Sequence, residues 1–369
     1  MRAKNIVRTT TILLFGFISS VVMAADYKIG VLAKNGATKA VKEWGDTANY
    51  LNSALPEDTF TIAPLSFEEV FPAIENQSVD FFLVNSSMFI TAKVKYDASA
   101  IATMINSRQG QALNSFGGVI LTYIDRDDIN KLEDLKGKTF MAVEASSFGG
   151  WQMAYKEFLD HGIDPISDLG SLQFGNKHDN VVLAIQNGEV DAGTVRTDTL
   201  ERMEATGDIS LSEFKILSKK KFSNFPFVVS TALYPEWPFA KIHSIPDAVA
   251  QKVADALIKM PSDHVAAKHA NIVGWSEPLD YSEVDVLQKL LKVGAYNEYL
   301  FFKNCRCTHR FTPIFGKQRG INGLRTAPLW SLGFRFSLTI EVVTDKDCIY
   351  VFMVPVFTFI LTSNIYPDD

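Results

Sequence analysis

The stretch TFMAVEASSFGGWQMAYKEFLDHGIDP, Thr139 to Pro165, shows how this chain folds. It starts as a short apolar strand, Phe140 to Val143, and passes through a loop of small residues, Ala145 to Gly150. Helical spacing of apolar residues then predicts an amphipathic helix from Trp151 to His161, and the Gly that follows ends it. A strand that leads through small residues into a helix is the repeating unit of an α/β protein.

The loop between this strand and helix predicts an anion-binding site. The first N–H groups of a helix have no partner inside the helix, and the helix dipole places partial positive charge there. Ser146 and Ser147 add hydroxyl donors, and Gly149 lets a ligand approach the backbone closely. The alternative is an ordinary N-cap and turn, in which these residues serve only the start of the helix.

The same alternation of strands and helices extends along the chain. The first unit has predicted strands at 27–33, 60–66 and 79–85, and predicted helices at 38–55 and 67–78. The second has predicted strands at 115–124, 140–143 and 190–195, predicted helices at 127–137, 151–161 and 178–186, and a further helix before Met203. A returning strand at 224–235 and helices at 245–260 and 280–294 complete the pattern.

This pattern predicts an α/β fold with two lobes, parallel sheets and helices on both faces of each sheet. Lobe 1 is expected to contain residues 25–118 and 226–296, and lobe 2 residues 119–225. The chain crosses between the lobes twice, so we expect a hinge and a ligand cleft there.

Ligands of open α/β sheets bind at the carboxyl ends of the strands. Those ends carry Lys34, the run Asn85-Ser86-Ser87, the loop at 144–150, and Arg196 with Thr197. Arg196 is notable because residues 25–295 contain few arginines and because it directly follows an apolar strand. Its planar guanidinium suits oxyanions, although a surface salt bridge is the alternative. Lys34 is a candidate by position, with a solvated surface lysine as its alternative.

Two further features have ordinary interpretations. His178 precedes Asp179 at the start of a predicted helix, which is typical of a neighbour of the helix cap rather than of a ligand group. The segment Tyr234 to Pro238 reads as a rigid aromatic turn, for which core packing or a contact between the lobes is expected.

Three stretches resemble the phosphate/phosphite/phosphonate-binding family of periplasmic binding proteins. They are GGVILTYIDRDDINKLEDLKGKTFMAVEASSFGGW (117–151), HGIDP (161–165) and HDNVVLAIQNGEVDAG (178–193). More narrowly, DAGTVRTDTLERM (191–203) and STALYPEWPFAKI (230–242) resemble the sensor input domains of tetrathionate-sensor-type histidine kinases. The resemblance covers residues 26–296 and implies a two-lobed periplasmic-binding-protein type 2 fold.

The resemblance also implies a site. The ligand is expected between the lobes, held by Ser146 and Ser147, by Asn85-Ser86-Ser87, and by Arg196 with Thr197. Phe148 stands where the family often has another hydroxyl, so sulfur oxyanions and small carboxylates stay open beside phosphonates. The implied role is the input domain of a two-component sensor, truncated before its kinase. The alternative is a substrate-binding protein that serves an ABC permease.

Composition and motifs exclude other classes. Residues 25–295 hold 25 Lys+Arg and 36 Asp+Glu, a formal charge of −11 that argues against nucleic acid but not against a small anion. No nucleophile elbow, HExxH or P-loop is present, so no enzyme is expected. Cys305 and Cys307 with His309 match no zinc pattern that has a fourth ligand. We therefore expect neither metal nor cofactor.

The two ends differ from the body of the chain. Arg2, Lys4 and Arg8 precede the apolar run Thr11–Val22, and a cut after Ala24 would complete a signal peptide (1–24) for export to the periplasm. An uncleaved anchor is the alternative. Residues 297–369 lose helical periodicity, and we interpret them as an atypical tail that is frameshifted or disordered.

The sequence of the tail does not decide whether the protein associates with a membrane. Its apolar run Ile349–Leu361 is broken by Pro355 and is short for a membrane span.

Overall fold

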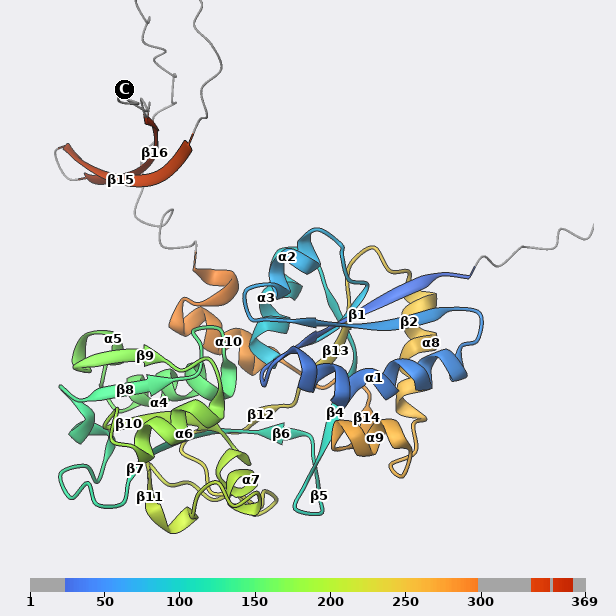
Figure 1. Cartoon of the computed structure of the whole chain (residues 1–369), viewed down its shortest axis with the longest axis horizontal. Helices are drawn as coiled ribbons and strands as arrows, with labels where there is room; N and C mark the ends of the chain where they lie inside the picture. The colour runs from blue at the N-terminus through green and yellow to red at the C-terminus, as the bar shows by residue number, and fades with distance from the viewer. Residues whose placement is uncertain (1–23, 298–332, 346–347, 361–369) are drawn as a thin grey trace, which may run out of the picture. The chain divides into compact units, whose positions relative to one another are not determined.

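The structure is a computed structural model that describes residues 24–297, 333–345 and 348–360 (Figure 1). The chain divides into two compact units, residues 1–297 and residues 298–369. The first unit contains two large β-sheets, which form the two lobes with their helices, and a two-stranded sheet. The expected signal peptide, Cys305, Cys307 and His309 lie outside the described residues.

Lobe 1 is built on a seven-stranded sheet of order β14-β4-β13-β3-β1-β2, with β5 paired to β4. Its strands are β1 (Asp26–Leu32), β2 (Thr59–Leu65), β3 (Phe81–Leu83), β4 (Ser99–Arg108), β5 (Gln111–Leu113), β13 (Pro238–Lys241) and β14 (Ile272–Ser276). β1 pairs in parallel with β2 and β3, as the alternation predicted. The strands that return after the hinge, β13 and β14, pair antiparallel, so the sheet is mixed rather than wholly parallel.

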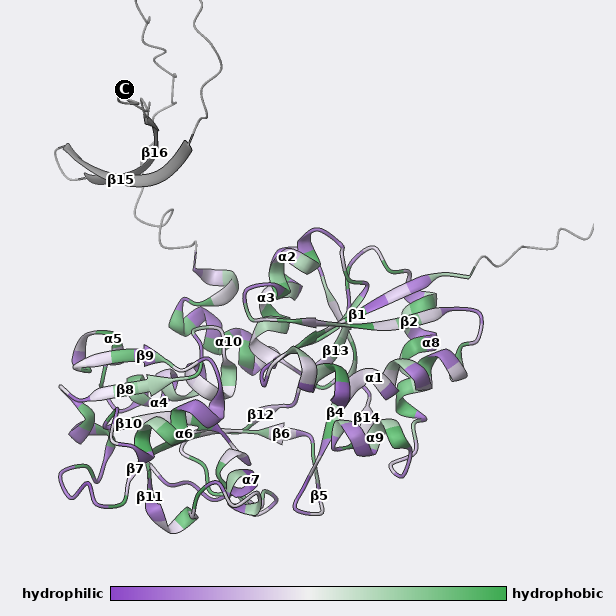
Figure 2. Cartoon of the chain, in the orientation of Figure 1, coloured by the Kyte–Doolittle hydropathy of each residue, from purple (hydrophilic) through white to green (hydrophobic). Residues whose placement is uncertain are grey.

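Six helices belong to lobe 1. They are α1 (Ala37–Ala54), α2 (Val70–Glu75), α3 (Ser86–Tyr96), α8 (Asp247–Ile258), α9 (Val265–Ala270) and α10 (Ser282–Leu291). Trp44, Ala48 and Leu51 of α1 are buried at helical spacing. Figure 2 shows hydrophobic and hydrophilic residues alternating along α1 and α8, as expected of helices with one face on a sheet.

Lobe 2 has a five-stranded sheet of order β11-β7-β10-β8-β9. Its strands are β7 (Gly118–Tyr123), β8 (Thr139–Ala142), β9 (Ser171–Phe174), β10 (Ala192–Arg196) and β11 (Phe214–Leu217). Its α-helices are α4 (Met153–Asp160), α5 (Pro165–Asp168), α6 (His178–Gln186) and α7 (Thr199–Ala205). β8 pairs in parallel with β9 and β10, whereas β7 pairs antiparallel with β10.

Two short strands form the hinge between the lobes. β6 (Ser115–Phe116) enters lobe 2 and β12 (Tyr234–Pro235) leaves it, and the two pair antiparallel with Tyr234 opposite Phe116. The two-lobed α/β fold predicted from the sequence is therefore confirmed. The hinge matters for function because any cavity between the lobes changes when they move.

The predicted strand at 224–235 is wrong over most of its length. Only β12 and an isolated bridge between Lys220 and Val229 pair there. Along β7, hydroxyl groups take the place of backbone partners: Gly118 N–H donates to Thr231 Oγ1 (2.9 Å) and Ile120 N–H donates to Ser230 Oγ (2.8 Å). Although β7 lies between β10 and β11, these side-chain partners satisfy the N–H groups of Gly118 and Ile120 without a regular strand on that side.

Two predicted helices also differ. The one expected at 127–137 is a single 3₁₀ turn, η1 (Leu132–Leu135). The one expected at 151–161 starts earlier, as a π-helical turn, η2 (Phe148–Gln152), that runs directly into α4. The glycines at 149 and 150 lie inside this turn, so the small-residue loop of the prediction is partly helical.

Helix α3 was not predicted, because the strand was expected to end in Asn85-Ser86-Ser87. Instead Asn85 caps the helix, and its side chain accepts from Met88 N–H at 2.9 Å. Every residue from Ser86 to Ala92 is buried. Because the first residues of α3 are buried on all sides, the sequence has no polar face at helical spacing there that would predict a helix.

Residues 333–360 contain a hairpin in which β15 (Gly333–Asp345) pairs antiparallel with β16 (Cys348–Ile360). The apolar run that begins at Ile349 lies largely in β16, and Pro355 stands opposite Leu338. The interpretation of residues 297–369 as an atypical tail that is frameshifted or disordered stays a prediction. Among the described helices, none combines the length and the hydropathy that a membrane crossing requires.

Candidate ligand-binding site between the lobes

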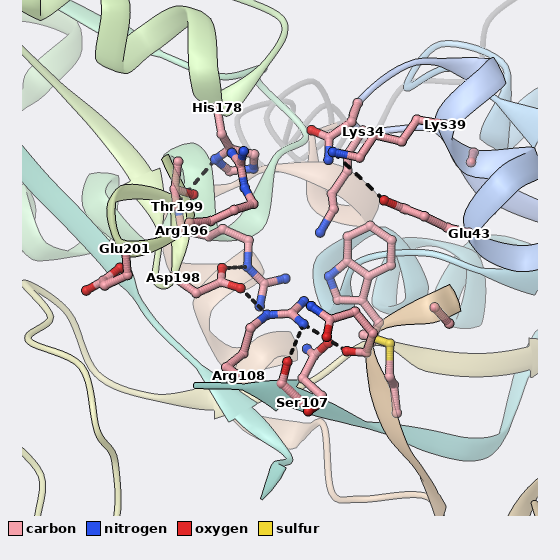
Figure 3. Close-up of a pocket in the computed structure, with 18 of the residues that line it drawn as sticks. Lys34, Lys39, Glu43, Ser107, Arg108, His178, Arg196, Asp198, Thr199 and Glu201 are labelled. Atoms are coloured by element: carbon pink, nitrogen blue, oxygen red, sulfur yellow. Dashed lines mark hydrogen bonds and ion pairs between the residues drawn. The ribbon is translucent and has the colours of Figure 1, made fainter. Parts of the chain in front are cut away.

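A cavity of about 460 Å³ lies among residues of both lobes, within the 300–1,000 Å³ usual for small-molecule sites. Lobe 1 contributes residues that include Lys34, Met104, Arg108 and Trp237, and lobe 2 residues that include His178, Arg196 and Asp198. Figure 3 shows Lys34 reaching in from one side, with Arg196, Asp198 and Arg108 facing it. Cationic side chains from opposite lobes therefore share one cavity.

Arg196 is the last residue of β10 and is only 5% exposed. Its Nη2 donates to Glu236 Oε1 at 2.8 Å, and its Nε lies 3.5 Å from Asp198 Oδ1. The guanidinium lies 4.5 Å from the ring centre of Phe116, a cation–π contact that fixes its plane. Its Nη1 is buried and has no hydrogen-bond partner among the residues that the structure describes. An anion that accepts from Nη1 would satisfy this donor.

His178 directly follows Lys177, the N-cap of α6, as expected of a neighbour of the helix cap, and it also lines the cavity. Arg196 N–H donates to His178 Nδ1 at 3.2 Å, which leaves the ring proton on Nε2. Burial lowers the pKa of His178 well below its usual value, and the charges of Lys34 and Arg196 lower it further. The imidazole is therefore neutral at physiological pH and can act as a hydrogen-bond donor.

Lys34 follows β1, and its Nζ lies 5.0 Å from the ring centre of Trp237. Burial lowers the pKa of Lys34 to about 7, and the nearby charges of Arg196 and Arg108 add to this shift. The Lys34 side chain therefore changes between its charged and its neutral form near neutral pH. A bound anion would stabilise the charged form and raise this pKa.

Asp198 connects the two lobes. Its carboxylate forms an ion pair with Arg108 of β4 and also faces Arg196. The backbone of Asp198 is left-handed, with φ of 70°, a conformation that costs most non-glycine residues roughly 1–2 kcal/mol. Arg108 is held further by donating from Nη1 to Asn271 O at 2.9 Å. The ion pairs therefore position both arginines at the cavity.

The polar residues predicted at the end of β3 lie elsewhere, at a contact between the lobes. Asn85 Nδ2 donates to Ser146 O at 3.3 Å, and Ser87 donates to Gln152 Oε1 at 2.5 Å. Ser86 donates to Pro235 O at 2.6 Å. The structure thus brings Asn85 close to the loop at Ser146, but this contact does not line the cavity.

The remaining predicted residues have other surroundings. Ser147 is buried. A Cβ added to Gly149 would lie 2.9 Å from the Arg196 Cβ and 2.9 Å from the Phe116 ring. Thr197 Oγ1 accepts from Gly117 N–H at 3.3 Å. Of the residues predicted for the site, Lys34 and Arg196 line the cavity.

Sequence reasoning did not assign Arg108, Asp198, Glu236 or Trp237 to the site. The sequence does contain one signal: Asp198 follows Arg196 by two residues at the end of an apolar strand. Glu236 lies in the aromatic turn for which only packing was expected, and it is almost fully buried against Arg196. A buried carboxylate beside a buried guanidinium is visible only once the turn and β10 are brought together.

Comparison with known proteins identifies relatives. Residues 29–282 match a family described as "ABC transporter, phosphonate, periplasmic substrate-binding protein". The tetrathionate sensor histidine kinase TtrS of Salmonella typhimurium is 31% identical over 288 residues, which are 78% of this chain and 47% of that protein. The phosphate-import protein PhnD of Mycolicibacterium smegmatis is 30% identical over 124 residues, 31% of this chain and 39% of that protein. This chain thus spans less than half the length of these relatives.

Solved structures share the fold. PhnD1 of Prochlorococcus marinus in complex with methylphosphonate has a TM-score of 0.60 and 13% identity, and the match covers 72% of this chain and 98% of that one. A binding protein component of an ABC phosphonate transporter from Pseudomonas aeruginosa has a TM-score of 0.56 and 16% identity over 75% and 96% of the two chains. At these identities the likeness supports the two-lobed architecture alone.

Proposed function

The chain belongs to the family of phosphonate-type periplasmic substrate-binding proteins, and we propose that it binds a small anion in the cavity between its lobes. The ligand is a sulfur oxyanion, a phosphorus oxyanion or a small carboxylate. The observation that carries this proposal is the convergence of Lys34 and Arg196 from opposite lobes on one cavity, with Arg196 Nη1 lacking a partner among the described residues. A donor buried without a partner costs about 1–3 kcal/mol, which an accepting anion would recover.

We assign a role to each proposed residue. Arg196 donates from Nη1, Lys34 supplies charge from lobe 1, and His178 offers a neutral N–H. Glu236 and Asp198 keep the arginines in place. Because the donors come from both lobes, an anion bound among them favours the closed arrangement of the lobes.

We further propose that this module is the input domain of a two-component sensor. The similarity to the tetrathionate sensor kinase over 78% of this chain supports this role. The alternative is a substrate-binding protein that delivers its anion to an ABC permease, which the family description supports. The family is periplasmic, so either role places the module outside the cytoplasm.

A thermal-shift screen of the full chain tests the proposed function. The anions are thiosulfate, tetrathionate, methylphosphonate, phosphate and succinate together with the monoanions methanesulfonate and acetate, each at several concentrations. A ligand at 100 times its Kd stabilises the native state by about 2.7 kcal/mol. We expect at least one anion to raise Tm in the wild type and not in Arg196→Ala. Equal shifts in both proteins would contradict the site, and no shift with any of the anions would contradict this ligand class.

A further inference from the structure

The charges around the cavity are almost all neutralised in pairs. Arg196 pairs with Glu236 at 2.8 Å, and Arg108 pairs with Asp198. On the outer wall, Lys39 pairs with Glu43 at 3.9 Å, and Arg202 pairs with Asp179. Each of these cations thus has a carboxylate of its own.

Lys34 is the exception. Among the residues that the structure describes, it is the cation of the cavity wall that forms no ion pair, and its close neighbour is the neutral ring of Trp237. Glu201 also lines the cavity without a cationic partner, but Figure 3 shows its carboxylate directed away from Lys34 and Arg196, beyond Asp198. His178 contributes a neutral donor. When Lys34 is protonated, the centre of the cavity therefore offers about one uncompensated positive charge.

We propose that this cavity selects an anion carrying one negative charge over an anion of the same shape carrying two. The inference deepens the proposed function and rests on it. A sulfonate, a sulfate ester or a carboxylate would then be favoured over a fully ionised phosphate ester or phosphonate. Glu236 and Asp198 are the residues that determine this preference, because they use up the charge of the two arginines.

The physical reason is the cost of an unpaired buried charge. A monoanion beside Lys34 and Arg196 Nη1 leaves the centre of the site neutral. A dianion would leave one negative charge uncompensated next to the carboxylates of Glu236 and Asp198, where desolvation makes it expensive.

Methyl sulfate and methyl phosphate provide a matched pair for the test. The sulfate ester is a monoanion throughout, whereas the phosphate ester loses its second proton with a pKa of about 6. Titration calorimetry on the full chain at pH 5 and pH 8 gives the ratio of the Kd of methyl phosphate to the Kd of methyl sulfate. Because both ligands meet the same Lys34, its titration largely cancels in the ratio. We expect a ratio near one at pH 5 and, at pH 8, methyl sulfate binding at least tenfold tighter.

Variants identify the carboxylates that are responsible. Asp198→Asn keeps a side chain that tolerates the left-handed backbone and removes one negative charge. Glu236→Gln removes the other and keeps the shape. In each variant we expect the ratio at pH 8 to fall to about threefold or less, with methyl phosphate gaining affinity. Glu201→Gln is the matched control and should keep the wild-type ratio, because Glu201 pairs with neither arginine.

A ratio that stays constant between pH 5 and pH 8 in the wild type, or that favours methyl phosphate at pH 8, overturns the proposal even if both variants fail to fold. An equal fall of the ratio in Glu201→Gln also overturns it, because the effect would then be one of general charge. If neither ester binds in competition with the best anion of the thermal-shift screen, the selectivity proposal fails while the anion site stands. If no anion in the thermal-shift screen raises Tm, both the anion site and the selectivity proposal fail.

Discussion

Arg196 is a residue that the sequence predicts for the site and that lines the cavity in the structure. A guanidinium that is 5% exposed requires partners, and Glu236, Asp198 and the ring of Phe116 supply them. These contacts leave Nη1 as the free donor. The residue is therefore positioned before any ligand arrives, which lowers the entropic cost of binding.

Replacing Arg196 should remove most of the affinity. We expect Arg196→Ala to weaken binding of the best anion by about 2–5 kcal/mol, since one partner of a buried charged contact is lost. Arg196→Lys should not restore it, because an ammonium lacks the planar fork. Titration calorimetry measures both. Arg126→Ala, which removes an arginine paired with Asp128 and Asp191 away from the cavity, is the control and should bind normally. Normal affinity in both Arg196 variants would exclude the residue from the site.

Lys34 should make binding depend on pH. Its pKa is lowered to about 7 by burial and by the neighbouring arginines. Below this pKa the ammonium is present and binding is at full strength; as pH rises through about 7 the free site loses the proton, and affinity falls by up to about tenfold per pH unit. Calorimetry with a monoanion between pH 6 and pH 9 measures the slope. Lys34→Met should bind weakly and show no such slope, whereas Lys39→Met should keep it.

At the scale of elements, the turn η2 packs tightly against the end of β10. Gly149 has no room for a side chain, because a Cβ would approach both Arg196 Cβ and Phe116 to 2.9 Å. We expect Gly149→Ala to destabilise the protein by about 1–3 kcal/mol through overpacking and to weaken anion binding by displacing Arg196. Denaturant unfolding and calorimetry measure the two effects. Gly45→Ala, on α1 with open space around the added methyl, is the control. An unchanged affinity in a stable Gly149→Ala protein would contradict the coupling.

Substitutions in the loop that contains Ser146 and Ser147 distinguish two positions for the anion. If the anion lies in the cavity, Ser146→Ala and Ser147→Ala should change the affinity by less than about 0.5 kcal/mol, as substitutions away from a site do. If the anion instead lies at the loop, as the sequence alone suggested, each should cost about 0.5–3 kcal/mol. Calorimetry on the two variants measures this difference. A loss in that range would move the proposed site from the cavity to the start of η2.

At the scale of the whole molecule, residues 24–297 belong to one compact unit with buried cores in both lobes. We expect a fragment of residues 25–297 to unfold at the same temperature as the full chain and to bind the same anion with the same Kd. The fragment should also be more soluble, because the run from Ile349 is apolar, β-branched and uncharged, a pattern prone to aggregation. Calorimetry and light scattering measure these properties. A lower Tm or weaker binding in the fragment would show that residues 298–369 support the body.

The sequence was enough to predict the alternation of strands and helices, the two lobes and the strand ends that carry Lys34 and Arg196. These are local properties, because periodicity and the residues that follow a strand can be read along the chain. It did not determine the antiparallel return strands, the start of α3 or the irregular segment before β12. In each case the backbone finds partners that lie far away in the chain, such as Thr231 beside Gly118.

Which polar residues share a cavity depends on how the folded chain brings distant segments together. Arg108, Asp198 and Glu236 come from three separate segments, and their ion pairs exist because the hinge places β4, β10 and the aromatic turn together. The same folding made Ser86 and Ser87 buried residues of α3. A charged or polar side chain is recognisable in a sequence, but its partners and its burial, which set its chemistry, depend on contacts between distant residues.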